Sequence, residues 1–315
     1  MNAGTFRPGL VLGQNQFRLE RFLARGSTGE VYEASSSEHG RAAVKLLRQE
    51  LARDDVWKRR FEREWNAALS IDSPYVARVL SAGVSGRTQS PWIAFELLEG
   101  ESLDVLIARE PRPPLADVTR FIEHLLLGLE AAHAVQVVHR DIKPGNLFFE
   151  RATSRLRILD FGVAKMTRLG EQTSGLTRLD DTLGTPDYMS PEHLRNPKLV
   201  DARTDLYGAG CVAFRLLSGR IPFEHGDPGM MRVLKESGGT PSLSAATRTT
   251  WPVELQRWID RMLAFDRESR PQTARVALDE WRSAVAAVTA FRSAPLSDAG
   301  GFEADTDVSP PSSSE

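Results

Sequence analysis

The most constraining feature of this sequence is the segment VVHRDIKPGNLFF, which runs from Val137 to Phe149. Between two apolar runs it carries two bases, an acid, an imidazole, a proline, a glycine and an asparagine. Buried strands do not normally hold such groups, and solvated loops are not normally bounded by Val-Val and Leu-Phe-Phe. The pattern indicates a polar loop that is held in place by short apolar strands.

Composition places the chain among ordinary globular proteins. Its 315 residues are 41% hydrophobic and 26% charged, which suits one large domain or two modest ones with a sizeable core. The formal net charge of −2 argues against a global attraction to nucleic acid or to a membrane. No stretch approaches the roughly 20 apolar residues that span a bilayer, and the N-terminus lacks the apolar core of a signal peptide.

Cys211 is the only cysteine, and it lies in the apolar run GAGCVAFRLL. A single cysteine excludes an intramolecular disulfide framework and is typical of a reducing compartment. We therefore expect Cys211 to be a core residue rather than a reactive thiol, and we expect the protein to be cytoplasmic.

The first hundred residues predict short strands and one helix. Alternating apolar and polar residues favour strands, and strands that follow one another with short turns favour an antiparallel sheet. The predicted strands cover residues 17–24, 30–34, 41–47, 76–84 and 91–98. The charged segment DVWKRRFEREWNAALS, residues 55–70, is helix-like.

After Gly100 the pattern becomes helical. Apolar residues fall on one face of residues 117–135, and residues 203–219 are apolar nearly all round, as in a buried helix. Two more helices are predicted at 252–265 and 273–288. The chain therefore divides into an N-terminal extension (1–16), a sheet lobe (17–97), a hinge (98–101), a helical lobe (102–291) and an acidic Pro/Ser-rich tail, expected to be disordered (292–315).

The segment ARGSTGEVY, residues 24–32, carries two glycines three apart between two predicted strands. Such a segment is either a tight turn or a lid whose backbone N–H groups face phosphates. Lys45 ends the apolar run AAVK; a lysine there either reaches solvent at an edge or needs an anion to be buried. The helix at 55–70 offers Glu64 as that anion, with Glu62 as the competing partner.

A second polar site follows in ILDFGVAK, where Asp160 comes nineteen residues after Asp141. Alone, Asp-Phe-Gly is most simply a turn. A carboxylate at a strand end, beside the amide oxygen of Asn146, is an arrangement of hard oxygen ligands that suits Mg²⁺. The occurrence of both motifs in this order favours the second interpretation.

The motifs follow one another as A-x-G-x-x-G-x-V, A-A-V-K, H-R-D-x-K-x-x-N, D-F-G and G-T-P-x-Y-M-S-P-E. In this order the chain resembles the eukaryotic-type Ser/Thr protein kinases, in particular their bacterial branch, over about residues 17–288. The resemblance implies an α+β, bilobal fold with a small antiparallel-sheet N-lobe that carries one helix and a larger helical C-lobe. It also implies ATP and Mg²⁺ as cofactors.

The resemblance implies a role for each polar residue of the catalytic loop. Asp141 would accept or orient the proton of the substrate hydroxyl, and Lys143 would steady the transferring phosphoryl group. Asn146 would hold Mg²⁺ together with the Asp of Asp-Phe-Gly. Arg140 would bind a phosphate on the activation loop. His139 would be structural, packed under the Phe of Asp-Phe-Gly.

The same resemblance assigns residues to the nucleotide. Gly26 and Gly29 would let the backbone lie close to the phosphates. Lys45 would pair with the α- and β-phosphates, with Glu64 holding it in place. The other residues expected to contact the nucleotide are Leu23, Ala24, Val31, Ala43 and Phe148, with backbone groups of Glu96 and Leu98.

In the helical lobe, the resemblance implies three supporting roles. Thr185 would hydrogen-bond toward Asp141 and shape the substrate groove. Glu192 would pair with Arg270 and tie the end of the activation segment to the lobe. Asp205 would brace the backbone of the catalytic loop.

Three positions depart from the family pattern. Ala24 stands where glycine is usual, Ser190 where alanine is usual, and Gly208 where serine or alanine is frequent. None of them removes a catalytic group, so the sequence indicates an active enzyme rather than a pseudokinase. Lys143, two residues after the catalytic Asp, and the GTPDYMSPE segment indicate Ser/Thr as the acceptor.

We therefore expect ATP-dependent phosphorylation of Ser/Thr hydroxyls on proteins, with autophosphorylation of the activation loop at Thr177 or Thr182. A phosphate there would pair with Arg140, although Asp180 and Asp181 could partly satisfy that arginine without phosphate.

The alternatives are a kinase-fold scaffold with little transfer and a small-molecule kinase. Expected partners are ATP and protein substrates, with a transient homodimer as the form in which trans-autophosphorylation would occur. Neither a nucleic acid nor a membrane span is expected.

Overall fold

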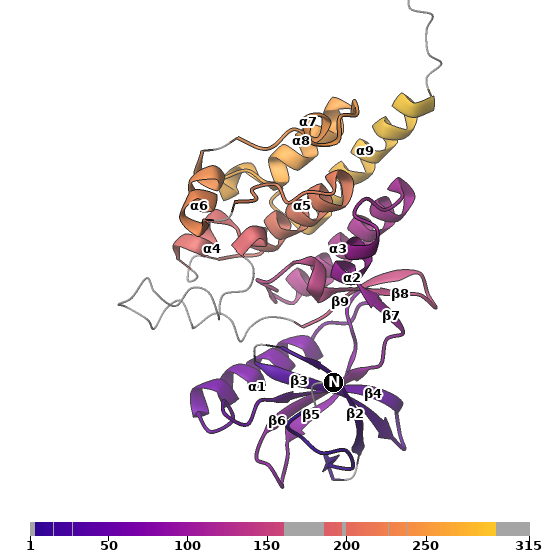
Figure 1. Ribbon diagram of the computed structural model, residues 1–315, viewed down its shortest axis with the longest axis vertical. Helices are drawn as coiled ribbons and strands as arrows, with labels where there is room; N and C mark the ends of the chain where they lie inside the picture. The colour runs from indigo at the N-terminus through magenta and orange to yellow at the C-terminus, as the bar shows by residue number, and fades with distance from the viewer. Residues whose placement is uncertain are drawn as a thin grey trace, which may run out of the picture.

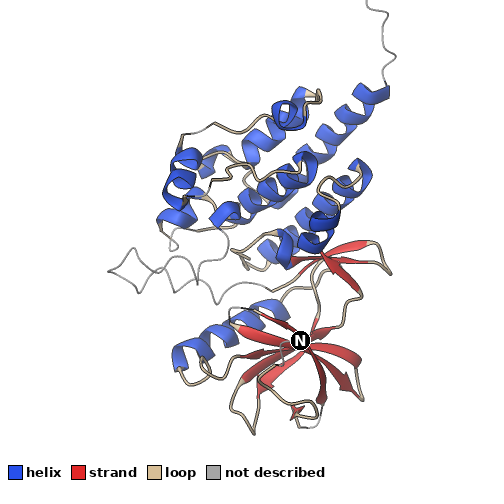
Figure 2. Cartoon of the chain, in the orientation of Figure 1, coloured by secondary structure: helices blue, strands red, loops and turns tan. Residues whose placement is uncertain are grey.

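The computed structural model of the chain has two lobes, which is the predicted fold class (Figure 1). Most strands gather in the small lobe, and most helices lie in the larger one (Figure 2). The structure describes residues 4–14, 16–26, 28–160, 186–196, 200–225, 227–237 and 239–293, without the side chains of Arg60, Glu64 and Pro228.

The small lobe is built on a six-stranded antiparallel sheet of order β1-β2-β3-β4-β6-β5. Its elements are β1 (Val11–Leu12), β2 (Phe17–Arg25), β3 (Gly29–Ser36), β4 (Gly40–Leu47), α1 (Asp55–Leu69), β5 (Val79–Val84) and β6 (Pro91–Glu96). The five longer strands and the helix match the predicted ones. α1 begins after Asp54, whose carboxylate accepts a hydrogen bond from the Val56 amide at 2.8 Å.

The two faces of this sheet bury different partners. On one face Leu47 and Ile93 pack against Phe61 of α1. On the other face Leu46 and Trp92, which alternate with them along β4 and β6, lie in a separate apolar cluster.

The N-terminal residues cover this second face. No element is predicted in residues 1–16, yet Phe6, Leu10 and Leu12 are buried against the sheet. β1 pairs with the start of β2 through Val11 opposite Arg18 and Leu12 opposite Phe17. A strand of two residues is too short for a periodicity test, so this element was missed.

Residues 97–99 join the lobes. They lead from β6 into a three-stranded sheet of order β7-β8-β9, formed by β7 (Gly100–Ser102), β8 (Leu147–Glu150) and β9 (Arg155–Ile158). The 3-10 turn η1 (Pro144–Asn146) runs directly into β8. This small sheet therefore carries the end of the polar loop noted in the sequence.

The large lobe is helical. Its elements are α2 (Leu103–Arg109), α3 (Leu115–Ala134), η3 (Pro186–Tyr188), α4 (Pro191–Arg195), α5 (Arg203–Ser218), α6 (Pro228–Glu236), α7 (Leu243–Thr247), α8 (Val253–Met262), η5 (Arg267–Ser269) and α9 (Ala274–Ser293). As predicted, α5 is buried on nearly every side; α3 and α8 pack against it, and α9 packs against α3 and α8 in the same core. Gly219 follows the last residue of α5 in a left-handed conformation with a φ of +75°, which suits glycine.

Cys211 lies fully buried in α5, and burial raises the pKa of its thiol to about 12, which confirms a core role.

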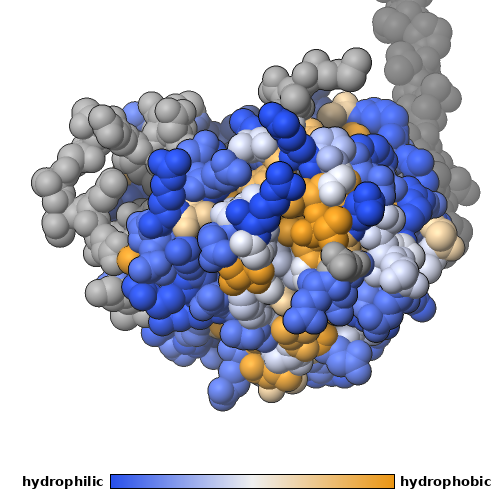
Figure 3. Space-filling view, turned by 90° about the horizontal axis from the view of Figure 1, so that it is seen from below, coloured by the Kyte–Doolittle hydropathy of each residue, from blue (hydrophilic) through white to orange (hydrophobic). Residues whose placement is uncertain are grey.

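No helix in the described ranges is long and apolar enough to cross a membrane. The surface at the small-lobe end is mostly hydrophilic, with apolar residues in small areas (Figure 3). The predicted tail begins at residue 292, but residues 292 and 293 form the end of α9; residues 294–315 lie outside the described part of the chain.

Candidate active site

The polar loop brings three predicted catalytic side chains together. Asn146 donates from Nδ2 to the Asp141 backbone carbonyl at 2.7 Å and to its Oδ2 at 2.6 Å. The Lys143 Nζ lies 3.3 Å from the same Oδ2. The Asp141 carboxylate is therefore fixed by a neutral donor and by a cation.

Asp205, in the first turn of α5, fixes the backbone of the polar loop. Its carboxylate accepts the backbone N–H of His139 at 2.9 Å and of Arg140 at 2.7 Å, and it contacts His133 Nε2 at 2.9 Å. Burial raises the pKa of Asp205, but the hydrogen bonds and the nearby imidazoles outweigh burial and lower it. The predicted brace is confirmed. It also supports the left-handed backbone of Arg140, whose φ is 67°.

The His139 imidazole is buried and serves the loop itself. Its Nε2 contacts the Leu159 carbonyl at 2.8 Å, and its Nδ1 accepts the Asp141 amide at 3.2 Å. The ring thus joins the catalytic loop to the end of β9, as a structural residue would. Its predicted packing under Phe161 lies outside the described residues.

Asp160 follows β9 and faces the small lobe. Its Oδ1 lies 3.1 Å from the Nζ of Lys45, which is only 7% exposed on β4. The Leu159 amide donates to the Asn146 carbonyl at 2.9 Å, which sets Asp160 beside the catalytic loop. The Lys45–Glu64 pair predicted from the sequence concerns a side chain outside the described part, so it stays a prediction.

The amide oxygen of Asn146 and the carboxylate of Asp160 suit a hard cation. Asn146 uses its amide nitrogen toward Asp141, which leaves its amide oxygen as an acceptor, and the Asp160 carboxylate is 41% exposed. Carboxylate and amide oxygens with room for water and phosphate are typical Mg²⁺ ligands. Across the described ranges, no group of three or more His, Cys, Asp or Glu could hold a metal by itself.

The glycine-rich turn joins β2 to β3. The Gly26 amide donates to the Gly29 carbonyl at 2.8 Å and closes the turn. A Cβ on Gly29 would lie 2.9 Å from the Leu46 carbonyl oxygen, so the close approach of β4 requires glycine here. A Cβ on Gly26 would have no neighbour nearer than 3.6 Å, so protein packing does not explain that glycine.

Val31 and Ala43, which are predicted to contact the nucleotide, lie on one face of β3 and β4. Val31 stands directly opposite Lys45, and Ala43 lies two residues before Lys45 on the same face. The Val31 and Ala43 side chains are half-buried, and Lys45 is buried. Phe148 on β8 is also half-buried and pairs with Ser102 across the junction sheet.

At the junction, Glu96 has an additional role that sequence reasoning missed. Its amide donates to the Arg78 carbonyl at 3.0 Å, so its carbonyl is the backbone group left for a ligand. Its carboxylate forms an ion pair with Arg157 of β9, which also lies 3.3 Å from Glu150. An arginine in a short buried strand is the one sequence signal that could have indicated this link. Leu98 lies in the connection that follows.

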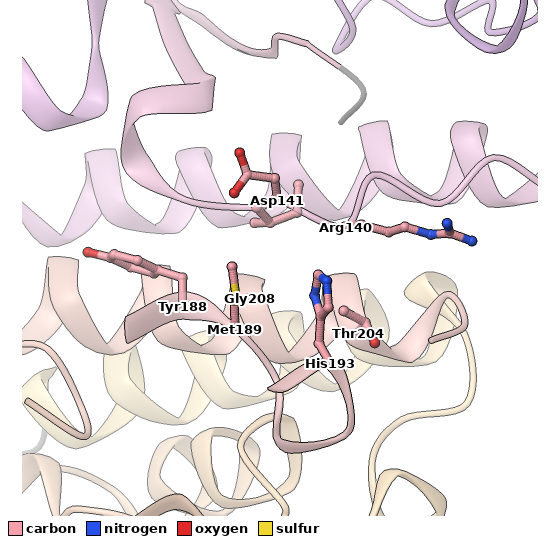
Figure 4. Close-up of a pocket in the computed structure, with 8 residues that line it drawn as sticks. Arg140, Asp141, Tyr188, Met189, His193, Thr204 and Gly208 are labelled. Carbon is pink, nitrogen blue, oxygen red and sulfur yellow. The ribbon is translucent and has the colours of Figure 1, made fainter. Parts of the chain in front are cut away.

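The segment from Pro186 to Glu192 borders the catalytic loop. Asp141, Tyr188, Met189 and Gly208 line one small pocket, with Arg140, Ile142, His193 and Thr204 (Figure 4). In this view the Asp141 carboxylate points away from α5, and the His193 ring points toward the loop. The predicted Glu192–Arg270 pair is confirmed, with two contacts of 2.7 Å. Thr185, Thr177 and Thr182 lie outside the described residues.

Arg140 extends from the loop on the side away from Tyr188 (Figure 4). Its Nε is buried and has no hydrogen-bond partner within the described ranges. Burial lowers the pKa of its guanidinium, and the charge of Asp205 only partly offsets this. A half-buried arginine whose buried Nε has no partner among the described residues favours an incoming anion.

Gly208 lies where α5 approaches the catalytic loop most closely. A Cβ there would lie 2.9 Å from the Ile142 Cβ and 3.0 Å from its carbonyl oxygen. Its departure from the family pattern therefore has a packing reason, which sequence reasoning did not provide.

Comparisons with known proteins show the family to which the chain is similar. The protein kinase domain model matches residues 17–282. The serine/threonine-protein kinase pkn2 of Myxococcus xanthus is 33% identical over 288 residues, 90% of this chain and 34% of that protein. PknB of Mycobacterium leprae is 31% identical over 264 residues, 82% of this chain and 41% of that protein. This chain thus spans less than half the length of these relatives.

Solved structures share the fold. The Mycobacterium tuberculosis PknI kinase domain has a TM-score of 0.68 and 25% identity, and covers 90% of this chain and 100% of that one. Rad53 residues 1–466 in complex with AMP-PNP has a TM-score of 0.67 and 22% identity, covering 85% of this chain and 66% of that one. With its family match from Phe17 to Arg282, this chain belongs to the protein kinase domain family.

Proposed function

We propose that this chain transfers the γ-phosphoryl group of ATP to serine or threonine hydroxyls of proteins. The observation that carries the proposal is the Asp141 carboxylate, held by Asn146 at 2.6 Å and by Lys143 at 3.3 Å. An acceptor hydroxyl bound at Asp141 would transfer its proton to the carboxylate as the new O–P bond forms and the bond to ADP breaks.

Other side chains would hold the nucleotide. Lys45, on β4, would pair with the α- and β-phosphates, and Asp160, 3.1 Å from it, would hold Mg²⁺ together with Asn146. Mg²⁺ bound there supplies charge neutralisation at the phosphates. Gly26 and Gly29 would let the backbone approach the phosphates, and Glu64 would support Lys45.

The adenine would lie at the junction of the lobes. Its edge would meet the Glu96 carbonyl and the Leu98 amide, because the Glu96 amide already donates to Arg78. The half-buried faces of Val31, Ala43 and Phe148, with Leu23 and Ala24 nearby, would cover the ring.

Protein rather than a small molecule is the acceptor class that the chain supports best. The GTPDYMSPE segment resembles the one that shapes a peptide groove in protein kinases, where Thr185 would hydrogen-bond toward Asp141. Pro186–Met189 is anchored in the large lobe by Lys235, which donates to three of its carbonyls. A binding module without transfer would not need the linked Asp141, Lys143 and Asn146 side chains.

We also infer that activity is regulated by autophosphorylation at Thr177 or Thr182, within a transient homodimer. The support is Arg140, whose Nε is buried without a hydrogen-bond partner in the described ranges. A phosphate of about −1.5 to −2 charge would pair with it and order the segment. Intact-mass analysis after incubation with Mg-ATP, followed by peptide mapping, tests this. An active enzyme without phosphate on this loop would favour Asp180 and Asp181 as built-in substitutes.

The central experiment is incubation with labelled ATP and a generic basic protein. The wild-type chain should label the protein, and Asp141→Asn should lower the rate by orders of magnitude without unfolding the chain. Asp160→Asn should abolish transfer. Wild-type rates in both variants would refute the proposed chemistry. No labelling of any protein by the wild type would favour the scaffold or the small-molecule alternative.

A further inference from the structure

Residues 4–12, here called the N-terminal strap, run across the small-lobe sheet on the face opposite α1. Phe6, Leu10 and Leu12 are buried there with Tyr32 and other sheet residues. The backbone joins as well, because the Gly9 amide donates to the Leu19 carbonyl at 2.7 Å and the Leu19 amide donates to the Leu10 carbonyl at 2.9 Å. The strap is therefore part of the lobe and not an appendage.

The strap is fastened by one fully buried carboxylate. Glu30, which is 0% exposed, accepts the Thr5 amide and hydroxyl, both at 2.8 Å, the Tyr32 hydroxyl at 2.6 Å and Arg25 Nη2 at 2.5 Å. The Phe6 amide in turn donates to the Tyr32 hydroxyl at 2.9 Å. Burial raises the pKa of Glu30, but these hydrogen bonds outweigh burial and lower it.

At Gly4 the strap packs closely against the side chains of Tyr32 and Phe22. A Cβ on Gly4 would lie 2.0 Å from the Tyr32 hydroxyl oxygen and 2.7 Å from Phe22 Cδ2. The Phe6 and Phe22 rings meet the Tyr32 ring edge-on, at centroid distances of 6.0 Å and 5.6 Å. Such complementarity fixes the position of the strap along the hairpin.

The anchor lies at the base of the glycine-rich turn. Arg25 and Glu30 form the last residue pair of the β2–β3 ladder before the turn. Because side chains alternate along β3, Glu30 and Tyr32 face the strap, whereas Val31 faces the proposed nucleotide side, opposite Lys45. The strap thus contacts one face of residues 30–32 of β3, and the nucleotide would contact the opposite face.

We infer that Glu30 is a positioning residue. Through Glu30 the strap holds the glycine-rich turn in the position that ATP binding requires. If the strap already orders the β2–β3 hairpin, the hairpin loses less conformational entropy when it binds the phosphates. The strap would therefore raise the affinity for the nucleotide. The inference rests on the proposed ATP-dependent function. It does not concern the protein substrate, which would bind to the large lobe.

Two full-length variants test it. Glu30→Gln turns one acceptor oxygen into a donor that faces the donors of Thr5 and Tyr32, and Thr5→Val removes only the hydroxyl. Both should raise the KM for ATP at least about fivefold, the lower end of typical coupling between sites, while the KM for the protein substrate stays unchanged. The Kd of a non-hydrolysable ATP analogue should rise in parallel.

Glu33→Gln is the matched control. Glu33 lies on the same strand and binds Arg41 at 2.8 Å and Arg21 at 2.6 Å; among the described residues it forms no ion pair with the strap. Its loss should leave the KM for ATP unchanged. If the Glu30 and Thr5 variants differed from wild type only in kcat, or matched Glu33→Gln in the KM for ATP, the positioning role would be refuted.

Hydrogen exchange without nucleotide separates this inference from the proposed function. Amides of the β2–β3 hairpin, residues 17–36, should exchange faster in Glu30→Gln than in Glu33→Gln, while α5 stays protected in both. Equal protection of the hairpin in the two variants would refute the anchor, whether or not the chain transfers phosphate. A wild-type chain that binds no ATP analogue would refute the proposed function even if the exchange result held.

Discussion

Arg270 and Glu192 form a two-pronged ion pair in the interior of the large lobe, with Nη1–Oε1 and Nη2–Oε2 distances of 2.7 Å each. Arg270 is 0% exposed, and its Nε also donates to the Ala264 carbonyl at 2.9 Å. Its guanidinium lies 4.9 Å from the centre of the Tyr207 ring. One side chain thus links α4, which holds the end of the predicted activation segment, to α5 and to the turn before α9.

Arg270→Met should destabilise the chain by about 3–5 kcal/mol, because it leaves the half-buried Glu192 carboxylate without its cation. Urea unfolding monitored by circular dichroism measures this. Arg275→Met is the control, because Arg275 pairs with Glu130 on the surface at 2.9 Å and should contribute no more than about 1 kcal/mol. Equal losses in the two variants would contradict the structural role of Arg270.

Acid should weaken this pair. Burial raises the pKa of Glu192, but the hydrogen bond and charge of Arg270 outweigh it and lower the pKa from 4.5 to about 2. A pKa depressed on folding adds stability above the unfolded value, and that stability is lost as pH falls from about 4.5 to about 2. The amount is on the order of 3 kcal/mol, and the difference in unfolding free energy between wild type and Glu192→Gln should shrink over this range. A pH-independent difference would contradict the assignment.

Lys235 of α6 should matter for the protein substrate. Its Nζ, 2% exposed, donates to the carbonyls of Pro186 at 2.8 Å, Asp187 at 3.0 Å and Met189 at 2.7 Å. Lys235→Met would remove the donor and release this segment, so the KM for a protein substrate should rise about tenfold, which corresponds to about 1.4 kcal/mol.

The KM for ATP should not change in Lys235→Met, because the segment lies beside the catalytic loop and away from the glycine-rich turn. Lys58→Met, at an exposed i,i+3 pair with Asp55 in α1, is the control and should change neither constant. Equal effects on both KM values in Lys235→Met would indicate general destabilisation instead.

Gly208→Ala should lower kcat and stability together. The new Cβ would lie 2.9 Å from the Ile142 Cβ, and overpacking of this kind costs about 1–3 kcal/mol. Because Ile142 adjoins Asp141, the strain would move the catalytic loop.

Gly210→Ala provides the comparison, since its Cβ would meet the Met262 Cβ at 2.6 Å, on the far side of α5. That variant should lose stability but retain more of its kcat per folded molecule. Equal kcat values for the two folded variants would show that Gly208 serves packing alone.

The sequence by itself determined the fold class and indicated the candidate site. Strand alternation, helix periodicity and the order of the motifs are local patterns, and each is readable within a few residues of chain. They placed Asp141, Lys143 and Asn146 on one loop, and the structure brings these three side chains into contact. The Glu192–Arg270 and Asp205 contacts also followed, through the family resemblance and not through any local pattern.

Only the tertiary structure decided which distant groups would meet. Lys235 is 49 residues from Pro186, Glu96 is 61 residues from Arg157, and Thr5 is 25 residues from Glu30. No local periodicity records such pairs, because their partners depend on how helices and strands pack. The same holds for Gly208, whose need for a missing Cβ arises only where α5 meets the catalytic loop. Burial then makes each pair matter, because a buried charge or carbonyl must find its partner inside the protein.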